Sequence, residues 1–255
     1  MSAPFVWYEL MTSDPRAAEQ FYSKVVGWRA KDSGMPDVQY TLLNVGETPV
    51  AGLMALSPEA VAGGAMPAWI GYIGADDVDA CVSRIAAGGG TTCHAAEDIP
   101  GVGRFAVLAD PGGAVFCVFK GSSAEPPAPL PAGTPGTIGW HELHAADGAK
   151  AWAFYSQQFG WTKDEAMDMG PMGVYQLFKA GAAQANGGMM TKMPEMPAPA
   201  WVYYFNVEGV DAATTRITDN GGTVINGPME VPGGQWIVQG LDPQGAMFAL
   251  VAPGR

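Results

Sequence analysis

The chain has 255 residues, and its 25 acidic and 13 basic side chains give a formal net charge of −12. Hydrophobic residues make up 48% of the sequence, which is typical of a folded protein and too high for a disordered one. The negative charge argues against binding to nucleic acid, which needs clustered Lys and Arg, and against binding to anionic membrane surfaces.

The start of the chain has neither a basic segment nor a long apolar stretch, so we expect no signal peptide. No window of 18 apolar residues predicts a transmembrane helix. The cysteines Cys81, Cys93 and Cys117 have no C-x-x-C spacing, which fits neither a disulfide framework nor a thiolate zinc site. We therefore expect a cytoplasmic location.

The first predicted element is a strand over residues 5–13. Because successive side chains of a strand point to opposite faces, Leu10 should lie on one face and Trp7, Glu9 and Met11 on the other. The shared face makes these three side chains candidates for a common site.

A helix should follow this strand, with Asp14 as its N-cap, Pro15 in its first turn and Gly27 just past its end. Its apolar residues recur at the spacing of one helix face. Short strands are predicted around 39–45 and 50–56.

The same order then recurs. A strand at 69–75 leads into a helix that ends at Gly88–Gly90, and strands are predicted near 91–96, 104–109 and 114–119. The repeating element is therefore β-α-β-β-β, and we predict four such modules in the chain.

The whole pattern is duplicated. A shift of 133 places residues 5–28 on residues 138–161 with ten identities, and a shift of 132 aligns the later part of each copy. We predict one domain over 1–120, a Pro-rich linker over 121–136 and a second domain over 137–255.

The motifs of the two copies resemble the glyoxalase/bleomycin-resistance/dioxygenase superfamily, also called vicinal oxygen chelate proteins. The resemblance depends on the "D…FY…GW" segments, on the helix openings Asp77-Val-Asp-Ala and Gly209-Val-Asp-Ala, and on the Asp-Pro-x-Gly turns at Asp110 and Asp242. It is closest to a two-domain, glyoxalase-like or hydroxylase-like bacterial subgroup. The resemblance implies an α+β fold in which four βαβββ modules pair into two cupped mixed β-sheets with flanking helices.

The family commonly binds a divalent metal, but the matching positions hold poor ligands. The first-strand ligand positions hold Trp7 and Trp140, and the last-strand Glu positions hold Cys117 and Ala249. A cation needs several O or N ligands that converge on it. We therefore predict no metal and no cofactor.

Two carboxylates and one imidazole are the candidate catalytic residues. Glu9 and Glu142 occupy equivalent positions, and each could be a general acid or base in an apolar cup or a structurally bonded, buried carboxylate. His144 should share a face with Glu142, where the first copy has Met11, and it could orient that carboxylate or lie partly exposed at a strand end.

Aromatic and soft side chains are the candidate ligand contacts. Trp7 and Trp140 could stack on a flat ligand, with Met11, Cys117 and Trp201 beside them, or the same side chains could fill a core. For Trp201 and Cys117 the structural interpretation is favoured.

Three functions remain open. The chain could bind a small apolar or aromatic molecule in a metal-free cup. It could be a metal-independent enzyme that uses Glu9 or Glu142 to move a proton on a carbonyl compound. It could also be a metal-dependent lyase, isomerase or dioxygenase with rearranged ligands. The expected partner is a small molecule, and the expected state is a monomer or a weak homodimer.

Overall fold

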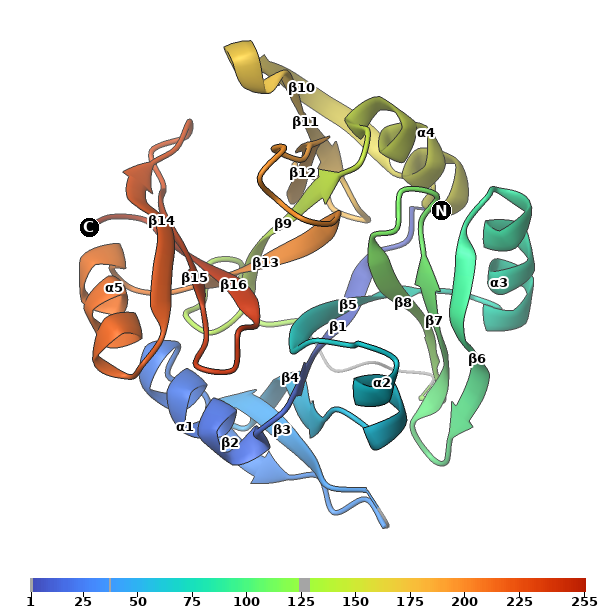
Figure 1. The fold of residues 1–255 in the computed structure, drawn as a ribbon, viewed down its shortest axis with the longest axis horizontal. Helices are drawn as coiled ribbons and strands as arrows, with labels where there is room; N and C mark the ends of the chain where they lie inside the picture. Colours follow the sequence, from blue (N-terminus) through green and yellow to red (C-terminus); the bar gives the residue numbers. More distant parts are fainter. Residues whose placement is uncertain (1, 37, 124–128) are drawn as a thin grey trace. The chain divides into compact units, whose positions relative to one another are not determined.

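All four predicted β-α-β-β-β modules are present in the computed structural model, which describes residues 2–36, 38–123 and 129–255 (Figure 1). Residues 124–128 of the predicted linker lie outside the described part. The elements of the first repeat are β1 Phe5–Thr12, α1 Pro15–Val25, β2 Arg29–Asp32, β3 Tyr40–Val45, β4 Thr48–Ala55, α2 Pro58–Ala62, β5 Ala68–Gly74, α3 Val78–Ala87, β6 Thr91–Ile99, β7 Gly103–Ala109 and β8 Val115–Gly121.

The second repeat has the same order of strands, with a single 3₁₀ turn added at Gly170–Met172. Its elements are β9 Ile138–Ala145, α4 Gly148–Phe159, β10 Thr162–Asp168, β11 Val174–Lys179, β12 Gly187–Thr191, β13 Ala200–Asn206, α5 Val210–Asp219, β14 Thr223–Glu230, β15 Trp236–Leu241 and β16 Met247–Ala252. No helix in the described part of the chain combines the length and apolar character needed to cross a membrane.

The local signals for α1 are confirmed. Asp14 caps the helix because its side chain accepts a hydrogen bond from the backbone N–H of Ala17 at 3.0 Å. Gly27 follows the last turn with φ +91°, a conformation that glycine adopts without steric cost. The apolar face of the helix, which includes Phe21 and Tyr22, is buried.

Two elements of the first repeat are absent from the sequence prediction. The strand β2 lies at the edge of its sheet and is mostly exposed, so its residues show no alternation of apolar and polar side chains. The helix α2 buries none of its residues, and so it has no apolar face to mark it in the sequence.

Two eight-stranded mixed sheets form the β-structure. Their strand orders are β2-β3-β4-β1-β5-β8-β7-β6 and β10-β11-β12-β9-β13-β16-β15-β14. Within each module the first strand pairs in parallel with the last, and the outer strands pair antiparallel. The fold is therefore the expected α+β arrangement of paired, cupped modules.

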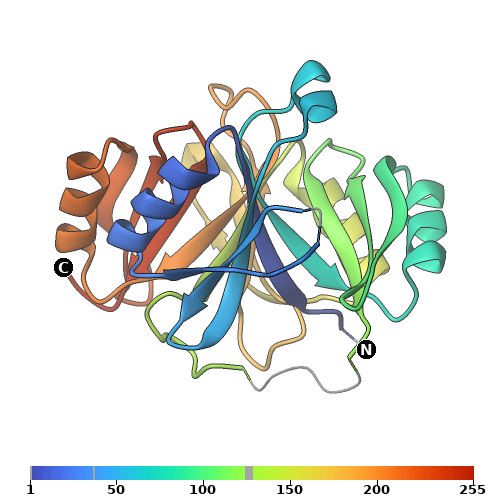
Figure 2. The ribbon, with the colours of Figure 1, turned by 90° about the horizontal axis from the view of Figure 1, so that it is seen from below.

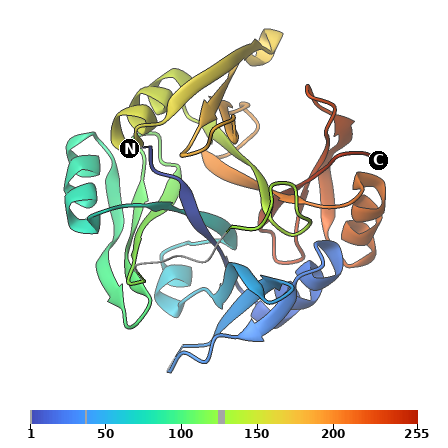
Figure 3. The same cartoon turned by 180° about the vertical axis from the view of Figure 1, so that it is seen from behind.

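The chain divides into two compact units, and each takes modules from both repeats. The described residues of unit 1 come from Met1–Val6, Gly71–Pro129 and His141–Trp201, and those of unit 2 come from Trp7–Ile70, Leu130–Trp140 and Val202–Arg255. In unit 1, α3 and α4 lie side by side (Figure 3). In unit 2, α1 and α5 do the same (Figure 2).

In unit 2, buried aromatic side chains of the first repeat make hydrogen bonds with one another and with residues in or next to the second repeat. The Tyr22 hydroxyl donates to Asp242 Oδ2 at 3.1 Å and accepts from the indole N–H of Trp69 at 2.8 Å. The indole N–H of Trp28 donates to the carbonyl oxygen of Gly136 at 2.8 Å. The "FY…GW" motif of the first repeat is thus bonded to the backbone just before the second repeat, at Gly136, and to a turn within that repeat, at Asp242.

Unit 1 contains the reciprocal arrangement. Tyr155 accepts a hydrogen bond from the indole N–H of Trp201 at 3.0 Å and hydrogen-bonds to Asp110 of the first repeat. The indole N–H of Trp161 donates to the carbonyl oxygen of Ala3 at 2.8 Å. Equivalent motif residues of the two repeats therefore make equivalent hydrogen bonds, one set in each unit.

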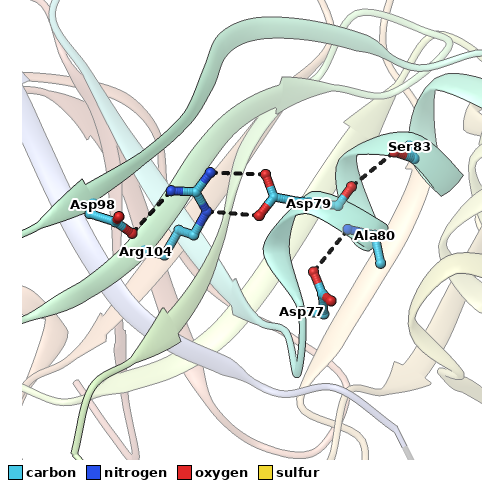
Figure 4. Close-up of polar contacts among 6 residues, drawn as sticks. All are labelled: Asp77, Asp79, Ala80, Ser83, Asp98 and Arg104. Atoms are coloured by element: carbon cyan, nitrogen blue, oxygen red, sulfur yellow. Dashed lines mark hydrogen bonds and ion pairs between the residues drawn. The ribbon is translucent and has the colours of Figure 1, made fainter.

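At the surface of unit 1, one arginine joins α3 to the neighbouring strands (Figure 4). Arg104 on β7 donates two hydrogen bonds of 2.9 Å to the carboxylate of Asp79 and one of 3.0 Å to Asp98. The guanidinium holds the pKa of Asp79 below its ordinary value. Because the two carboxylates are exposed and the arginine partly so, the network contributes little to stability.

Candidate functional site

The candidate residues of the first repeat share one face of β1. Glu9 pairs with Gly52 of the parallel strand β4, and Met11 pairs with Met54. Strand alternation therefore places Trp7, Glu9 and Met11 together on the face opposite Leu10. Glu9 is buried, whereas Trp7 and Met11 remain partly exposed.

A tyrosine that the sequence analysis missed borders this face. The indole N–H of Trp7 donates to the Tyr40 hydroxyl at 2.9 Å. Tyr40 occupies the space above Gly52, because a Cβ atom at that glycine would overlap the phenol. The sequence signal is a glycine inside a strand, which marks a close approach by another group.

The second repeat builds the same arrangement on β9. Glu142 pairs with Gly188 of β12, and His144 pairs with Met190. The ring of Tyr175 lies over Gly188, as Tyr40 lies over Gly52. The tyrosine therefore covers the register partner of Glu142, and His144 takes the position that Met11 has in the first repeat.

Glu142 and His144 form a close pair inside unit 1. Glu142 Oε2 lies 3.3 Å from His144 Nε2, with 10% and 14% of the two side chains exposed to solvent. Both ring nitrogens of His144 are buried and make no hydrogen bond within the described residues, so the 3.3 Å approach is not directed along an N–H bond.

Trp140 lies against an apolar cluster in unit 2. Its ring packs on Val202, Tyr204, Ala249 and Val251, together with Ile237 and Met247. Ala249 stands at the last-strand ligand position of the family, and Gln239 is its partner on β15. The Gln239 amide donates to the Tyr204 hydroxyl at 2.6 Å, so an amide–phenol pair borders this position.

Cys117 and Trp201 are buried in unit 1. Cys117 lies on β8 between its register partners Tyr72 and Val107, where it contributes to an apolar face. Trp201 lies on the face of β13 opposite Val202, and its ring contacts Tyr155 and other core aromatic side chains. In these positions both side chains are buried.

The remaining histidines have separate environments in unit 1. His94 is exposed and lies 2.8 Å from the Glu97 carboxylate. His141 is buried, its Nδ1 lies 2.6 Å from the carbonyl oxygen of Asn186, and its ring stacks on Phe5. Burial lowers the pKa of His141 to about 4, which keeps the imidazole neutral at physiological pH.

The donor set does not fit the metal of the family. The expected ligand positions hold Trp7, Trp140, Cys117 and Ala249, of which only the thiol is a metal-binding group. Within residues 2–36, 38–123 and 129–255, no three His, Cys, Asp or Glu side chains are grouped to hold a cation. We therefore derive no chemical step through a metal.

Two shallow depressions open on the surface of unit 2. One, of about 200 Å³, is lined by residues that include Arg29, Lys31 and Asn44. The other, of about 220 Å³, lies over α1 beside Phe21 and Lys24. None of the eight candidate residues lines either depression.

Sequence comparison agrees with the fold. The sequence model of the glyoxalase-like domain matches residues 7–119, and the model of the glyoxalase/bleomycin resistance protein/dioxygenase superfamily matches residues 137–250. The chain is 34% identical over 250 residues to "Putative glyoxylase CFP32" of Mycobacterium bovis, covering 97% of this chain and 94% of that protein. The chain belongs to the glyoxalase/bleomycin resistance protein/dioxygenase superfamily.

Other relatives differ in their named roles. "Anthracycline biosynthesis protein DnrV" of Streptomyces peucetius is 30% identical over 257 residues, with coverage of 96% of this chain and 91% of the relative. Among solved structures, the Mn(II)-bound glyoxalase from Novosphingobium aromaticivorans has a TM-score of 0.66, 17% identity and coverage of 99% and 82%. Homoprotocatechuate 2,3-dioxygenase from Arthrobacter globiformis has a TM-score of 0.69, 14% identity and coverage of 98% and 80%. These two similarities establish the shared fold.

Proposed function

We propose that this protein binds a flat aromatic or apolar carbonyl compound against the face of β1 or that of β9, each taken by itself, and moves a proton on it without a metal. The partly exposed rings of Trp7 and Trp140 supply apolar surface with a defined orientation, which favours planar ligands. The anthracycline role named for a full-length relative supports an aromatic, carbonyl-bearing ligand.

The observation that carries the proposal is the buried carboxylate beside these rings. Glu9 and Glu142 are both buried, each on the same face of its strand as a tryptophan. A carboxylate that is largely shielded from water can act as a general base on a compound held against it. Such a group can remove a proton from carbon next to a carbonyl group.

Ligand binding can be tested with 1,8-dihydroxyanthraquinone as the probe and calorimetry as the measurement. We expect saturable binding that weakens about tenfold in W7L or W140L. The matched control is W152L, which removes a partly exposed indole from α4 rather than from the β1 or β9 face. Absence of saturable binding, or equal weakening in all three variants, would contradict the proposal.

The metal-dependent alternative receives support from the family, since the named structural neighbours include a Mn(II)-bound glyoxalase and dioxygenases. Elemental analysis of untagged protein, purified without chelators, distinguishes the two. We expect substoichiometric Mn, Fe, Zn and Ni. One equivalent of any of these metals, retained through dialysis and lost in E142Q, would favour the alternative.

A further inference from the structure

We propose that the two repeats have diverged in function, so that the second repeat alone transfers the proton, with Glu142 as the base and His144 as the residue that positions it. The inference rests on the proposed function and adds to it which copy acts. The first repeat keeps the same face for binding only.

The scaffold around the two carboxylates is the same. Each glutamate pairs with a strand glycine, Gly52 or Gly188, and a tyrosine ring covers each glycine. A tryptophan lies two residues before each glutamate and on the same strand face. The common scaffold explains why a carboxylate occurs in both copies and does not by itself distinguish them.

The difference lies two residues after each glutamate. The second repeat has His144, whose Nε2 is 3.3 Å from Glu142 Oε2, and the first repeat has Met11. An imidazole can donate an N–H to a carboxylate oxygen, fix its orientation and exchange protons with solvent. A thioether has no proton to donate and offers only a weak acceptor.

The surroundings of His144 favour this role over a structural one. A structural histidine in this fold is His141, whose Nδ1 is bonded to the Asn186 carbonyl oxygen and whose ring stacks on Phe5. His144 has no hydrogen bond at either ring nitrogen within the described residues, and its nearest ionisable partner is Glu142. Buried polar groups are rarely left without a partner in the protein, so both ring nitrogens are available to the neighbouring carboxylate or to a bound compound.

The substrate class follows from this pair. A carboxylate positioned by an imidazole suits abstraction of one carbon-bound proton from a planar, activated compound, with no redox partner and no added nucleophile. The proton leaves carbon for Glu142, and its bonding electrons pass into the adjacent carbonyl group as an enolate. Return of the proton at another atom completes an isomerisation. Departure of a leaving group from the carbon next to the deprotonated one, with its bonding electrons, completes an elimination instead.

A chromogenic probe measures this step without the natural substrate. In 5-nitrobenzisoxazole, a base removes the proton at C3, the N–O bond breaks and the nitrile-bearing phenolate that forms is coloured. Full-length protein should convert it faster than acetate at the same pH, with a primary isotope effect on the C3-deuterated probe. We expect E142Q to lower kcat about 100-fold, the loss typical of a missing general base.

Comparison of the repeats tests the division directly. E9Q should lower kcat much less than E142Q does, while the surface control E208Q should leave it unchanged. H144M, which gives the second repeat the residue of the first, should lower kcat about tenfold with little change in KM, because it removes positioning rather than binding. H144Q keeps an N–H donor and should retain more of the rate than H144M.

The outcomes separate the two proposals. Equal losses in E9Q and E142Q, or a larger loss in E9Q, would overturn the division while leaving metal-free proton transfer in place. Equal losses in H144M and H144Q, together with a raised KM, would assign His144 to binding and overturn its positioning role. A wild-type protein that binds the anthraquinone but shows no rate above acetate would overturn proton transfer itself. Loss of folding in E142Q, seen by circular dichroism, would leave the decision to the histidine variants.

Discussion

At the scale of single residues, equivalent positions of the two repeats have acquired different electrostatic properties. Tyr8 and His141 occupy the same position of their strands, and both are packed against aromatic rings. Burial raises the pKa of Tyr8 above its ordinary value and lowers that of His141 to about 4. Of these two groups, only His141 changes its charge within the pH range in which protein stability is ordinarily measured.

The histidine makes stability depend on pH. The folded-state pKa of about 4 lies below the unfolded value of about 6.5, so the unfolded chain binds this proton more readily. Its full contribution is therefore present above pH 6.5 and is lost as the pH falls towards 4, by up to about 3 kcal/mol. H141N should flatten this part of the profile of unfolding free energy, measured by urea denaturation between pH 7 and 4.

The control for loss of an imidazole as such is H94N, which removes an exposed histidine instead of a buried one. The raised pKa values of the buried carboxyls Asp110 and Asp242 act in the opposite direction and are common to all variants. The comparison therefore uses the difference from wild type at each pH. Identical profiles for H141N and wild type would show that His141 does not titrate as described.

At the scale of elements, helix ends are joined to the neighbouring module by equivalent side chains. Arg216 of α5 donates two hydrogen bonds, of 3.2 and 3.0 Å, to the carbonyl oxygen of Val25 at the end of α1. Arg84 of α3 likewise donates to the carbonyl oxygen of Gln158 near the end of α4 at 3.2 Å. A cation at a helix C-terminus satisfies a free carbonyl group and complements the helix dipole.

The bond between α1 and the turn before β16 gives a sharper test at this scale. Y22F removes the hydroxyl that bonds Asp242 and leaves the Trp69 indole N–H without its acceptor. Burying unpaired polar groups costs about 2 kcal/mol, so we expect a fall in Tm of about 4–8 °C by calorimetry.

The double variant Y22F/W69F identifies the cause of this loss. If the shared hydroxyl is responsible, the two changes should combine to less than the sum of their separate effects, because both remove the same hydrogen bond. Strictly additive losses would show that the Tyr22–Trp69 bond contributes nothing of its own.

At the scale of the whole molecule, the repeats depend on each other. Unit 2 contains bonds from the first repeat to Asp242 and to Gly136, and unit 1 contains bonds from the second repeat to Asp110 and to Ala3. Each compact unit therefore contains residues from both halves of the sequence. A repeat by itself can make none of these four bonds.

Separate expression of residues 1–123 and 129–255 tests this dependence. We expect each fragment alone to lack a cooperative unfolding transition or to self-associate, because the apolar faces of α1 and α4 lose their partners. Mixing the fragments should restore a one-to-one complex with the near-ultraviolet circular dichroism of the intact chain, measured beside light scattering. A fragment 1–123 that is monomeric and unfolds cooperatively would contradict this view.

Much of the fold and of the local site could be predicted from the sequence. Strand alternation determined that Trp7, Glu9 and Met11 share a face, and the cap at Asp14 and the glycine at 27 determined where α1 lies. These features depend on residues that are close in sequence, so their periods and dihedral preferences are visible without the fold. The exposed β2 and α2 carry no such period and were missed for that reason.

The tertiary structure decided which of these side chains meet. Strand alternation predicted that Glu142 and His144 share a face, and the structure brings them within 3.3 Å. The tyrosines over Gly52 and Gly188 come from other strands, and a glycine inside a strand marks a close approach without identifying the group that makes it. The bonds from Tyr22 to Asp242 and from Trp28 to Gly136 join residues more than 100 positions apart. Local preferences specify strands, helices and faces, whereas partners distant in sequence are selected by the packing of the modules around each core.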